Sequence, residues 1–443
     1  MSLSVSQEVD QLRSGSATGA PQEVRDRPVQ ATPASQPEPA GLLHGVGFWS
    51  VAAAFAVMMG FSAVPTPLYG LYAVRDGFGS LTITVVYAVY AVGVILALFT
   101  VGHVSDWYGR RRVMIPALLI AALSAVLFLV WRDLAGLIVA RFVDGIAVGA
   151  TTATATAWIG ELHAARRPSA TPRRAEIVGA ATNLGGIGSG PLIAGVLAEW
   201  VTKPLTTPYL VFLGLMAITA VGLVLTPETS TMKPADRPHY HPQQIKAPAQ
   251  ARAAFFGALI AAFIAFAALA LFTSLAQTFL AGPLRHPSLA LAGAAAFLVF
   301  AAAAASQIAL ISLGRQALAA FGALCITAGS VAIVVAVQLS SPSLWLFLVG
   351  GGVLGAGVGA YFKSSMGTVI ALSDPGNRAG VLTMFFLVGY IGLSIPAVGL
   401  GVLAQEMEAK TALLIFGAML IAGVAASAGF LLRRPETDTG AKP

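Results

Sequence analysis

The sequence predicts an all-α membrane protein in which twelve transmembrane helices form two pseudo-symmetric six-helix bundles. Its 443 residues are 57% hydrophobic and only 10% charged, whereas a soluble domain carries roughly 25% charged residues. Such a chain cannot cover itself with a polar surface. The other two observations are a series of long apolar runs and motifs that recur between the two halves of the chain.

The apolar runs follow one another with short polar connections between them. As helices, they are long enough to cross the roughly 30 Å of hydrocarbon in a bilayer. We expect the spans at residues 46–68, 81–104, 113–131, 135–160, 176–200, 208–226, 252–279, 288–312, 317–339, 343–370, 380–404 and 411–432.

Two stretches outside the spans are polar and long. Residues 1–44 are rich in Ser, Pro, Gln and Ala with few large apolar residues, a composition typical of disorder. Residues 227–250 form the long polar stretch in the chain interior. We therefore predict a disordered cytoplasmic tail (1–44), an N-terminal six-helix bundle (45–226), a cytoplasmic linker (227–250), a C-terminal six-helix bundle (251–432) and a cytoplasmic tail (433–443).

The distribution of basic residues predicts the orientation. With an even number of spans, both termini lie on the same side of the membrane. Placing them in the cytoplasm puts 19 Lys and Arg on the inner side and 5 on the outer side, as the positive-inside rule requires. We expect a multi-pass protein of the cell membrane with cytoplasmic termini. The net charge of +7 then reflects the inner loops and does not indicate a nucleic-acid partner.

Two motifs recur in the halves about 208 residues apart. Small residues recur in any membrane bundle because they allow helices to approach closely. A Pro-Glu-Thr triplet has no such packing role, so its recurrence favours an internal repeat. The repeats are Gly145-x-x-x-Gly149 with Gly355-x-x-x-Gly359, and Pro227-Glu228-Thr229 with Pro435-Glu436-Thr437.

The most informative connection is GHVSDWYGRRR, which lies between two uncharged apolar runs. Its glycines permit a sharp turn and a close approach of the backbone. Asp106 is placed either to pair with the arginines or to cap a helix start. We predict a conformational hinge or gate made of Gly102, Asp106, Gly109, Arg110, Arg111 and Arg112.

This segment, Gly102-x-x-x-Asp106-x-x-Gly109-Arg110-Arg111-Arg112, resembles the signature loop between helices 2 and 3 of the major facilitator superfamily. In helix 4, Arg141-x-x-Asp144-Gly145 resembles the family pattern R-x-x-Q-G, with aspartate in place of glutamine. The resemblance implies the major facilitator fold, alternating access about a central substrate path, and an acid at 106 that helps to hold the inner gate shut.

Helix 5 extends the resemblance to the twelve-helix proton-coupled drug antiporters. Its packing motif, Gly186-x-x-x-Gly190-Pro191-x-x-Ala194-Gly195, is similar to their G-x-x-x-G-P-x-x-G-G, with Ala194 replacing a glycine. Several of those antiporters carry a proton-binding acid in helix 1, whereas the segment around Pro65 has none. The resemblance implies a small-molecule substrate and protons as partners.

Charges inside spans are rare and usually functional, because a bilayer disfavours them. Arg141 and Asp144 lie in the middle of helix 4, three residues apart and therefore on one face. One interpretation is a structural ion pair; the other is proton coupling by a carboxylate whose protonation is balanced between burial and the neighbouring arginine. Lys363 either faces the cavity or reaches the interface by snorkelling.

Uncharged polar residues in the spans are further candidates. Each forms either an interhelical hydrogen bond or part of the cavity wall. The possible substrate-cavity residues are Tyr87, Tyr90, Asn183, Gln277, Gln307, Tyr361, Lys363 and Tyr390.

We predict a secondary active transporter that exports small organic molecules or drugs by proton-coupled alternating access. A proton-coupled importer of a small metabolite and a non-transporting membrane sensor on the same fold are the alternatives. The six histidines form no motif with an intramembrane acid, and no nucleotide-binding or catalytic pattern is present. We therefore expect no enzyme activity, no metal site and no cofactor, in a monomer embedded in the lipid bilayer.

Overall fold

The structure is a computed structural model that describes residues 42–102, 104–230, 252–373 and 378–432, all within one unit, Ala40–Pro443. Nearly all of the predicted tail 1–44, most of the predicted linker 227–250 and the whole of 433–443 lie outside the described residues. The first helix begins at Leu42, three residues before the predicted start of the N-terminal bundle.

Among the described residues there are twelve helical segments long and apolar enough to cross a membrane, and no strand. This confirms the predicted fold class. The spans are α1 (Leu42–Ala63) with the 3₁₀ turn η1 (Thr66–Leu68) and α2 (Tyr69–Asp76); α3 (Ser80–Thr100); α5 (Arg110–Val130); α6 (Leu134–Arg166); α7 (Arg173–Ala180) with the π turn η2 (Ala181–Gly185) and α8 (Gly186–Trp200); α9 (Thr207–Leu225); α10 (Arg252–Ala270) with the π turn η4 (Leu271–Leu275) and α11 (Ala276–Ala281); α12 (Leu289–Ala309); α13 (Arg315–Gln338); α14 (Leu344–Ala371); α15 (Arg378–Glu406); and α16 (Ala409–Leu431).

The first span is longer than its apolar run predicts. The prolines at 65 and 67 interrupt α1, but the chain continues through η1 into α2 and ends only at Asp76. Gly77 then stops the helix in a left-handed conformation (φ 72°), which glycine adopts without steric cost. A short helix, α4 (Val104–Tyr108), follows α3 in the predicted hinge.

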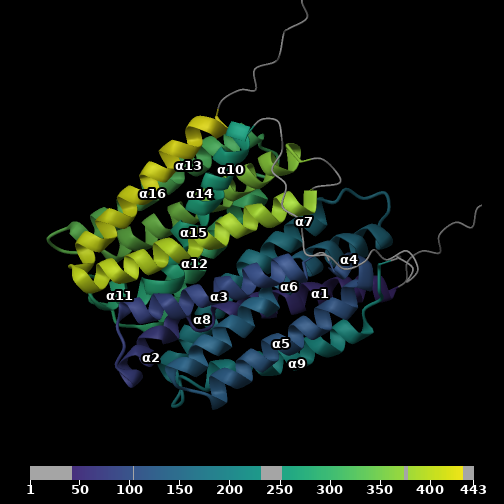
Figure 1. The fold of residues 1–443 in the computed structure, drawn as a ribbon, viewed down its shortest axis with the longest axis horizontal. Helices are drawn as coiled ribbons and strands as arrows, with labels where there is room; N and C mark the ends of the chain where they lie inside the picture. Colours follow the sequence, from purple (N-terminus) through teal and green to yellow (C-terminus); the bar gives the residue numbers. More distant parts are fainter. Residues whose placement is uncertain (1–41, 103, 231–251, 374–377, 433–443) are drawn as a thin grey trace, which may run out of the picture. The chain divides into compact units, whose positions relative to one another are not determined.

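The two halves pack in equivalent ways. In the first half α6 contacts α3 and α5, and α1 contacts α6, α8 and α9; in the second half α14 contacts α12 and α13, and α10 contacts α14, α15 and α16. Figure 1 shows the purple-to-teal helices of the first half gathered beside the green-to-yellow helices of the second. The halves meet where α3 packs against α15 and α8 packs against α12. These matched contacts are those expected of a pseudo-two-fold repeat.

The recurring glycines make equivalent contacts in the two halves. An added Cβ at Gly145 or Gly149 would meet a backbone carbonyl of α3, and one at Gly355 or Gly359 would meet a backbone carbonyl of α12. In both halves the missing side chain therefore allows the fourth span to touch the second, as small residues do in membrane bundles.

Because successive spans run in opposite directions, the connections between them lie alternately at the two ends of the bundle. We call the end with α4 and the connections at 167–172 and 227–230 the hinge end, and the other the opposite end. At the opposite end, Asp133, Ser288 and Ser343 each accept a hydrogen bond from a backbone N–H in the first turn of the following helix. Such N-caps stabilise a helix start by about 1 kcal/mol.

Candidate functional site

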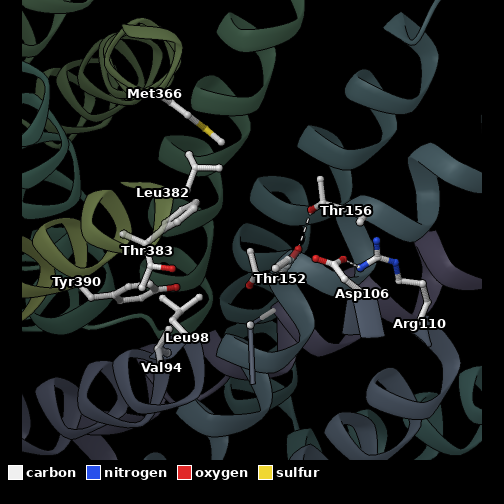
Figure 2. A pocket seen from close by; sticks show the side chains of 14 residues that line it. Val94, Leu98, Asp106, Arg110, Thr152, Thr156, Met366, Leu382, Thr383 and Tyr390 are labelled. Carbon is white, nitrogen blue, oxygen red and sulfur yellow. Dashed lines mark hydrogen bonds and ion pairs between the residues drawn. The ribbon is translucent and has the colours of Figure 1, made fainter. Parts of the chain in front are cut away.

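Among the described residues, three neighbouring cavities lie between the halves in the interior of the bundle. The hinge-end cavity, of about 370 Å³, lies between Asp106, Thr152 and Thr156 on one side and Leu382, Thr383 and Phe386 on the other. Figure 2 shows Asp106, Thr152 and Thr156 facing Leu382 and Thr383, with Tyr390 below Thr383. The cavity is bounded by α3, α4 and α6 of the first half and by α14 and α15 of the second.

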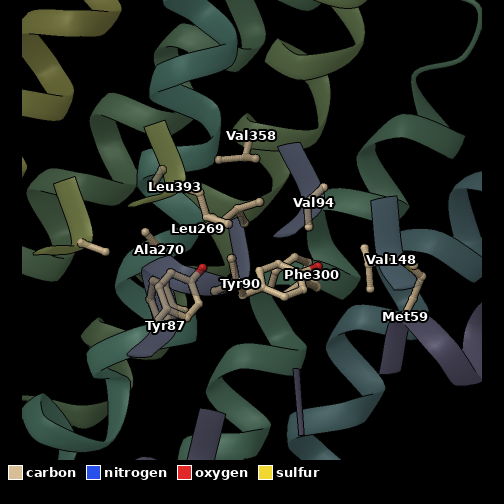
Figure 3. Packing of buried hydrophobic residues seen from close by; sticks show 14 of the residues in the cluster. Met59, Tyr87, Tyr90, Val94, Val148, Leu269, Ala270, Phe300, Val358 and Leu393 are labelled. Atoms are coloured by element: carbon tan, nitrogen blue, oxygen red, sulfur yellow. The ribbon is translucent and has the colours of Figure 1, made fainter. Parts of the chain in front are cut away.

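Two smaller cavities continue from it toward the opposite end. The aromatic chamber, of about 110 Å³, shares Thr152, Phe386 and Tyr390 with the hinge-end cavity. The arginine chamber, of about 70 Å³, is lined by Arg141 and by several hydroxyl groups. The two chambers share Tyr90 and Phe300, which Figure 3 shows close together among the buried side chains. The cavities thus form a series that reaches the charged pair of α6.

The predicted pair is formed and is almost fully buried. An Arg141 terminal nitrogen lies 2.7 Å from Oδ2 of Asp144, and the two side chains are 2% and 1% exposed. The same nitrogen donates to the carbonyl of Ser62 on α1 at 2.7 Å, and the guanidinium lies 4.3 Å from the ring centroid of Tyr90. Neither Nε of Arg141 nor Oδ1 of Asp144 has a hydrogen-bond partner among the described residues. Each of the two charged groups therefore has one buried polar atom without a hydrogen bond. Burying such an atom costs free energy.

Hydrogen bonds connect the two halves between this pair and the opposite end. The Thr66 hydroxyl donates to the Thr273 carbonyl at 3.1 Å, joining the interrupted parts of the first and seventh spans. The Tyr87 hydroxyl lies 2.6 Å from Oγ1 of Thr273. Glu199, at the end of α8, accepts hydrogen bonds from the backbone N–H groups of Leu289 and Ala290 at the start of α12. These hydrogen bonds join the two halves on the side of the charged pair that faces the opposite end.

Arg110 is the centre of the predicted hinge. One of its terminal nitrogens lies 2.5 Å from Asp106, and the other lies 2.6 Å from Glu161 at the end of α6. It also donates to the hydroxyl of Ser105 at 2.7 Å. Its side chain is only 10% exposed, so the buried guanidinium is compensated by two acids and a hydroxyl.

The helix start in the hinge is capped by a residue other than Asp106. Glu228, in the Pro-Glu-Thr triplet after α9, accepts from the backbone N–H groups of Arg110 and Arg111 at 2.8 and 3.0 Å. Gly109 supplies the turn before α5 with φ 108°, a value that favours glycine. Of its two predicted roles, Asp106 therefore has the one of pairing with an arginine. Glu228 of the Pro-Glu-Thr triplet caps the helix instead.

The Asp106→Asn substitution should lower transport about fivefold while leaving membrane abundance near normal. Arg110 retains Glu161 as a partner, and Asp106 is 56% exposed, so its pairing is worth about 1 kcal/mol or less in the folded state. A shift of that size in a two-state equilibrium corresponds to about fivefold. Initial transport rates normalised to protein amount measure the effect. Asp76→Asn, an exposed acid paired with Arg75, is the matched control, and wild-type turnover in Asp106→Asn would remove this acid from the gate.

The other predicted residues are distributed unevenly. Tyr87, Tyr90 and Tyr390 line the arginine chamber, and Asn183 and Gln307 line the aromatic chamber. The Lys363 ammonium donates to the Gln307 carbonyl at 2.9 Å. Gln277 lies apart from the three, in a hollow of about 510 Å³ at the opposite end. Tyr361 is fully buried against α16, where its hydroxyl lies 2.7 Å from that of Ser427.

The helix-5 motif, Gly186 to Gly195 of the fifth span, lies in α8 and allows this helix to pack closely against two other helices. An added Cβ at Gly186 or Gly190 would meet the backbone of α1, whereas one at Gly195 would meet the carbonyl of Leu289 on α12. Gly293 on α12 approaches the carbonyl of Pro191 in return. Because α12 belongs to the second half, the motif contributes to the contact of α8 with α12 between the halves.

Several residues of the cavity wall and of the Arg110 cluster were not predicted from the sequence. Phe266, Phe300, Phe362 and Phe386 line the aromatic chamber, but phenylalanines in membrane helices are common and carry no periodic signal. Glu161 did give a signal, because it is an acid at the end of an apolar run, only five residues before the basic pair at 166 and 167.

Known proteins resemble the chain at the level of sequence and fold. The family model described as "Major Facilitator Superfamily" matches residues 50–341. A Bacillus subtilis (strain 168) protein named "Uncharacterized MFS-type transporter YfkF" is 27% identical over 175 residues, which are 39% of this chain and 43% of that protein. The chain thus matches less than half of that relative's length.

Two solved structures share the fold. The nucleoside transporter NupG has a TM-score of 0.66 and 14% identity, over 87% of this chain and 99% of its own. The human organic anion transporter MFSD10 (TETRAN) has a TM-score of 0.61 and 16% identity, also over 87% and 99%. At these identities the likeness shows the fold alone.

Proposed function

The chain belongs to the Major Facilitator Superfamily and is a membrane transporter of that type; from this premise we propose proton-coupled export of a small organic molecule by alternating access. The observation that carries the proposal is the buried Arg141–Asp144 pair. It lies beside the arginine chamber, at the end of the series of cavities that is farthest from the hinge end. A titratable acid at this depth is costly unless it has a function. Its unused oxygen leaves a place for a proton.

Export is supported by the match of the fifth span, which contains α8, to the drug-antiporter pattern. Gly186, Gly190 and Gly195 bring α8 against both α1 and α12, so the motif that distinguishes this branch contributes to the contact between the halves. Alternating access requires the halves to move as units about such contacts.

Proton-coupled import is the second candidate, and a different observation favours it. Asp144 has Arg141 as its ion-pair partner, and Arg141 lines a cavity with an unused N–H. A proton on Asp144 would release the guanidinium for an anionic group. Proton and substrate would then bind together, which is the requirement for cotransport.

Flux in proteoliposomes tests the proposal and separates the two directions. Purified protein is reconstituted with a pH dye inside, and candidate substrates are added outside under an imposed pH gradient. Antiport predicts that substrate enters as protons leave, whereas cotransport predicts that both enter together. The absence of any coupled proton movement, with substrate still crossing, would overturn proton coupling.

We also propose that the hinge end is cytoplasmic, as the basic connections indicate. A cysteine introduced at Ser169, in the 167–172 connection, should resist a membrane-impermeant thiol reagent in intact cells. A cysteine at Ser340, in the connection before α14, should react. Both variants need Cys325 replaced, since it is the single cysteine of the chain. Labelling at position 169 with protection at position 340 would reverse the orientation.

A further inference from the structure

The aromatic chamber and the arginine chamber differ sharply in chemistry although they are adjacent. One is lined by rings and the other by a guanidinium and hydroxyl groups. We propose that the transported molecule is a planar aromatic acid, with its ring in the aromatic chamber and its anionic group toward Arg141. This inference rests on the proposed transport function, but it holds for either direction.

The rings of the aromatic chamber form a connected series across the halves. The centroid of the Phe266 ring lies 5.3 Å from that of Tyr390 and 5.9 Å from that of Phe362. Tyr390 in turn lies 6.4 Å from Tyr90 of the first half. Aromatic faces and edges at this spacing favour a flat ligand that stacks or meets them edge-on. A planar ring therefore suits the chamber better than a puckered aliphatic ring of similar size.

The arginine chamber is built to receive hydrogen-bond acceptors. Arg141 is 2% exposed, lines the chamber and has an Nε–H without a partner among the described residues. The hydroxyl-bearing residues Thr66, Tyr87 and Thr273 line the same space. The three hydroxyl groups already have partners in the protein, whereas the guanidinium matches the geometry of a carboxylate, so an acid group would satisfy the one N–H of Arg141 that is left unused.

The charges around the two chambers disfavour a cation. No Asp or Glu is among the described residues that line either chamber. Asp144 touches Arg141 but does not line the cavity, and the Lys363 ammonium lies 2.9 Å from the carbonyl of Gln307, a residue of the aromatic chamber wall. Neither chamber wall therefore offers a carboxylate to a cation, and the Tyr90 face that could hold a cation is already covered by Arg141 at 4.3 Å.

One small molecule can reach both chambers. Tyr90, Phe266, Phe300 and Tyr390 line each of them, so the ring position and the acid position are neighbours on either side of these shared side chains. Because the chambers are adjacent, we test a ring joined to its acid group by a short link.

Four probes that share one skeleton test the charge and the shape. Phenylacetate, phenylacetamide, phenethylamine and cyclohexylacetate are titrated at neutral pH into the purified full-length protein by calorimetry. Phenylacetate should bind at least about tenfold more tightly than phenethylamine and more tightly than either of the other two probes. Equal or tighter binding of phenethylamine would overturn the charge assignment, and equal binding of cyclohexylacetate would overturn the planar ring.

Two variants test which chamber binds the ring and which binds the acid group. Phe266→Leu should weaken phenylacetate severalfold, whereas Phe347→Leu, which removes a buried ring outside the three cavities, should leave it unchanged. The double variant Arg141→Gln/Asp144→Asn leaves no unpaired buried charge. It should bind phenylacetamide as before and lose the preference for phenylacetate, and a preserved preference would remove Arg141 from recognition.

Binding and flux distinguish this inference from the proposed function. If none of the four probes binds at millimolar concentration while another compound shows coupled flux, the aromatic-acid assignment is overturned and proton coupling stands. If phenylacetate binds but crosses the membrane without any coupled proton movement, the coupling is overturned and the cargo assignment stands.

Discussion

Asp144→Asn should abolish pH-gradient-driven transport while the protein still folds and binds its substrate. The side chain is 1% exposed, and its Oδ2 lies 2.7 Å from Arg141. Asparagine keeps an oxygen that can accept from the guanidinium but cannot take up or release a proton. The measurement is substrate flux with and without a pH gradient in proteoliposomes, beside the melting temperature of the same preparation. Downhill exchange without a gradient should persist.

The control for this substitution is Asp133→Asn. It removes a carboxylate from the start of the same helix, where the side chain oxygen accepts from the backbone N–H of Gly136, and asparagine serves equally well in such a cap. Flux in this variant should equal that of the wild type. Full coupling in a stable Asp144→Asn protein would refute its role as the proton carrier. A lowered melting temperature with normal coupling would leave the pair a structural one, of the kind whose disruption costs about 3–5 kcal/mol.

Gly190→Val should lower the stability of the protein by several kcal/mol and greatly reduce its amount in the membrane. An added Cβ at this position overlaps the carbonyl group of Gly60 on α1. A backbone carbonyl cannot turn away as a side chain can, so α1 and α8 must separate. Overpacking of this kind typically costs about 1–3 kcal/mol for added methylenes and more where backbone must move. Thermal unfolding of the detergent-solubilised protein measures the loss.

Gly185→Ala is the matched control within the same span, because an added Cβ there meets nothing within 4 Å. Its melting temperature should equal or slightly exceed that of the wild type, as expected when alanine replaces a helical glycine. If the two variants melted alike, the close approach of α1 and α8 would not be what the helix-5 motif provides.

The twelve spans were predictable because each is encoded locally, by an apolar run with polar residues at both ends. The pairing of Arg141 with Asp144 was equally accessible, since three residues in a helix place both on one face. The partners of Arg110 were not. Glu161 lies 51 residues away and Glu228, which caps the helix that Arg110 begins, lies 118 residues away. Contacts at such separations depend on how the spans pack, and a single sequence does not reveal that.

The residues that line the cavities also divide into those that the sequence predicted and those that it did not. Tyr90 and Tyr390 were identified because a phenol inside an apolar run is unusual, whereas Phe266 and Phe362 resemble any lipid-facing residue until the halves are assembled. Gln277 and Tyr361 carry the same kind of signal as Tyr90 but lie away from the three central cavities. Polarity in a span therefore indicates a partner, and only packing decides whether that partner is a neighbouring helix or the cavity.

The capping contact of Glu228 changes what the charged connection at 102–112 can do. The backbone after α9 is fastened to the first turn of α5 through Arg110 and Arg111, and the hydroxyl of Ser230 donates to the carbonyl of Asp106. A loop held at three points within its own half is stiff. We therefore expect residues 102–112 to move together with the first half as one body.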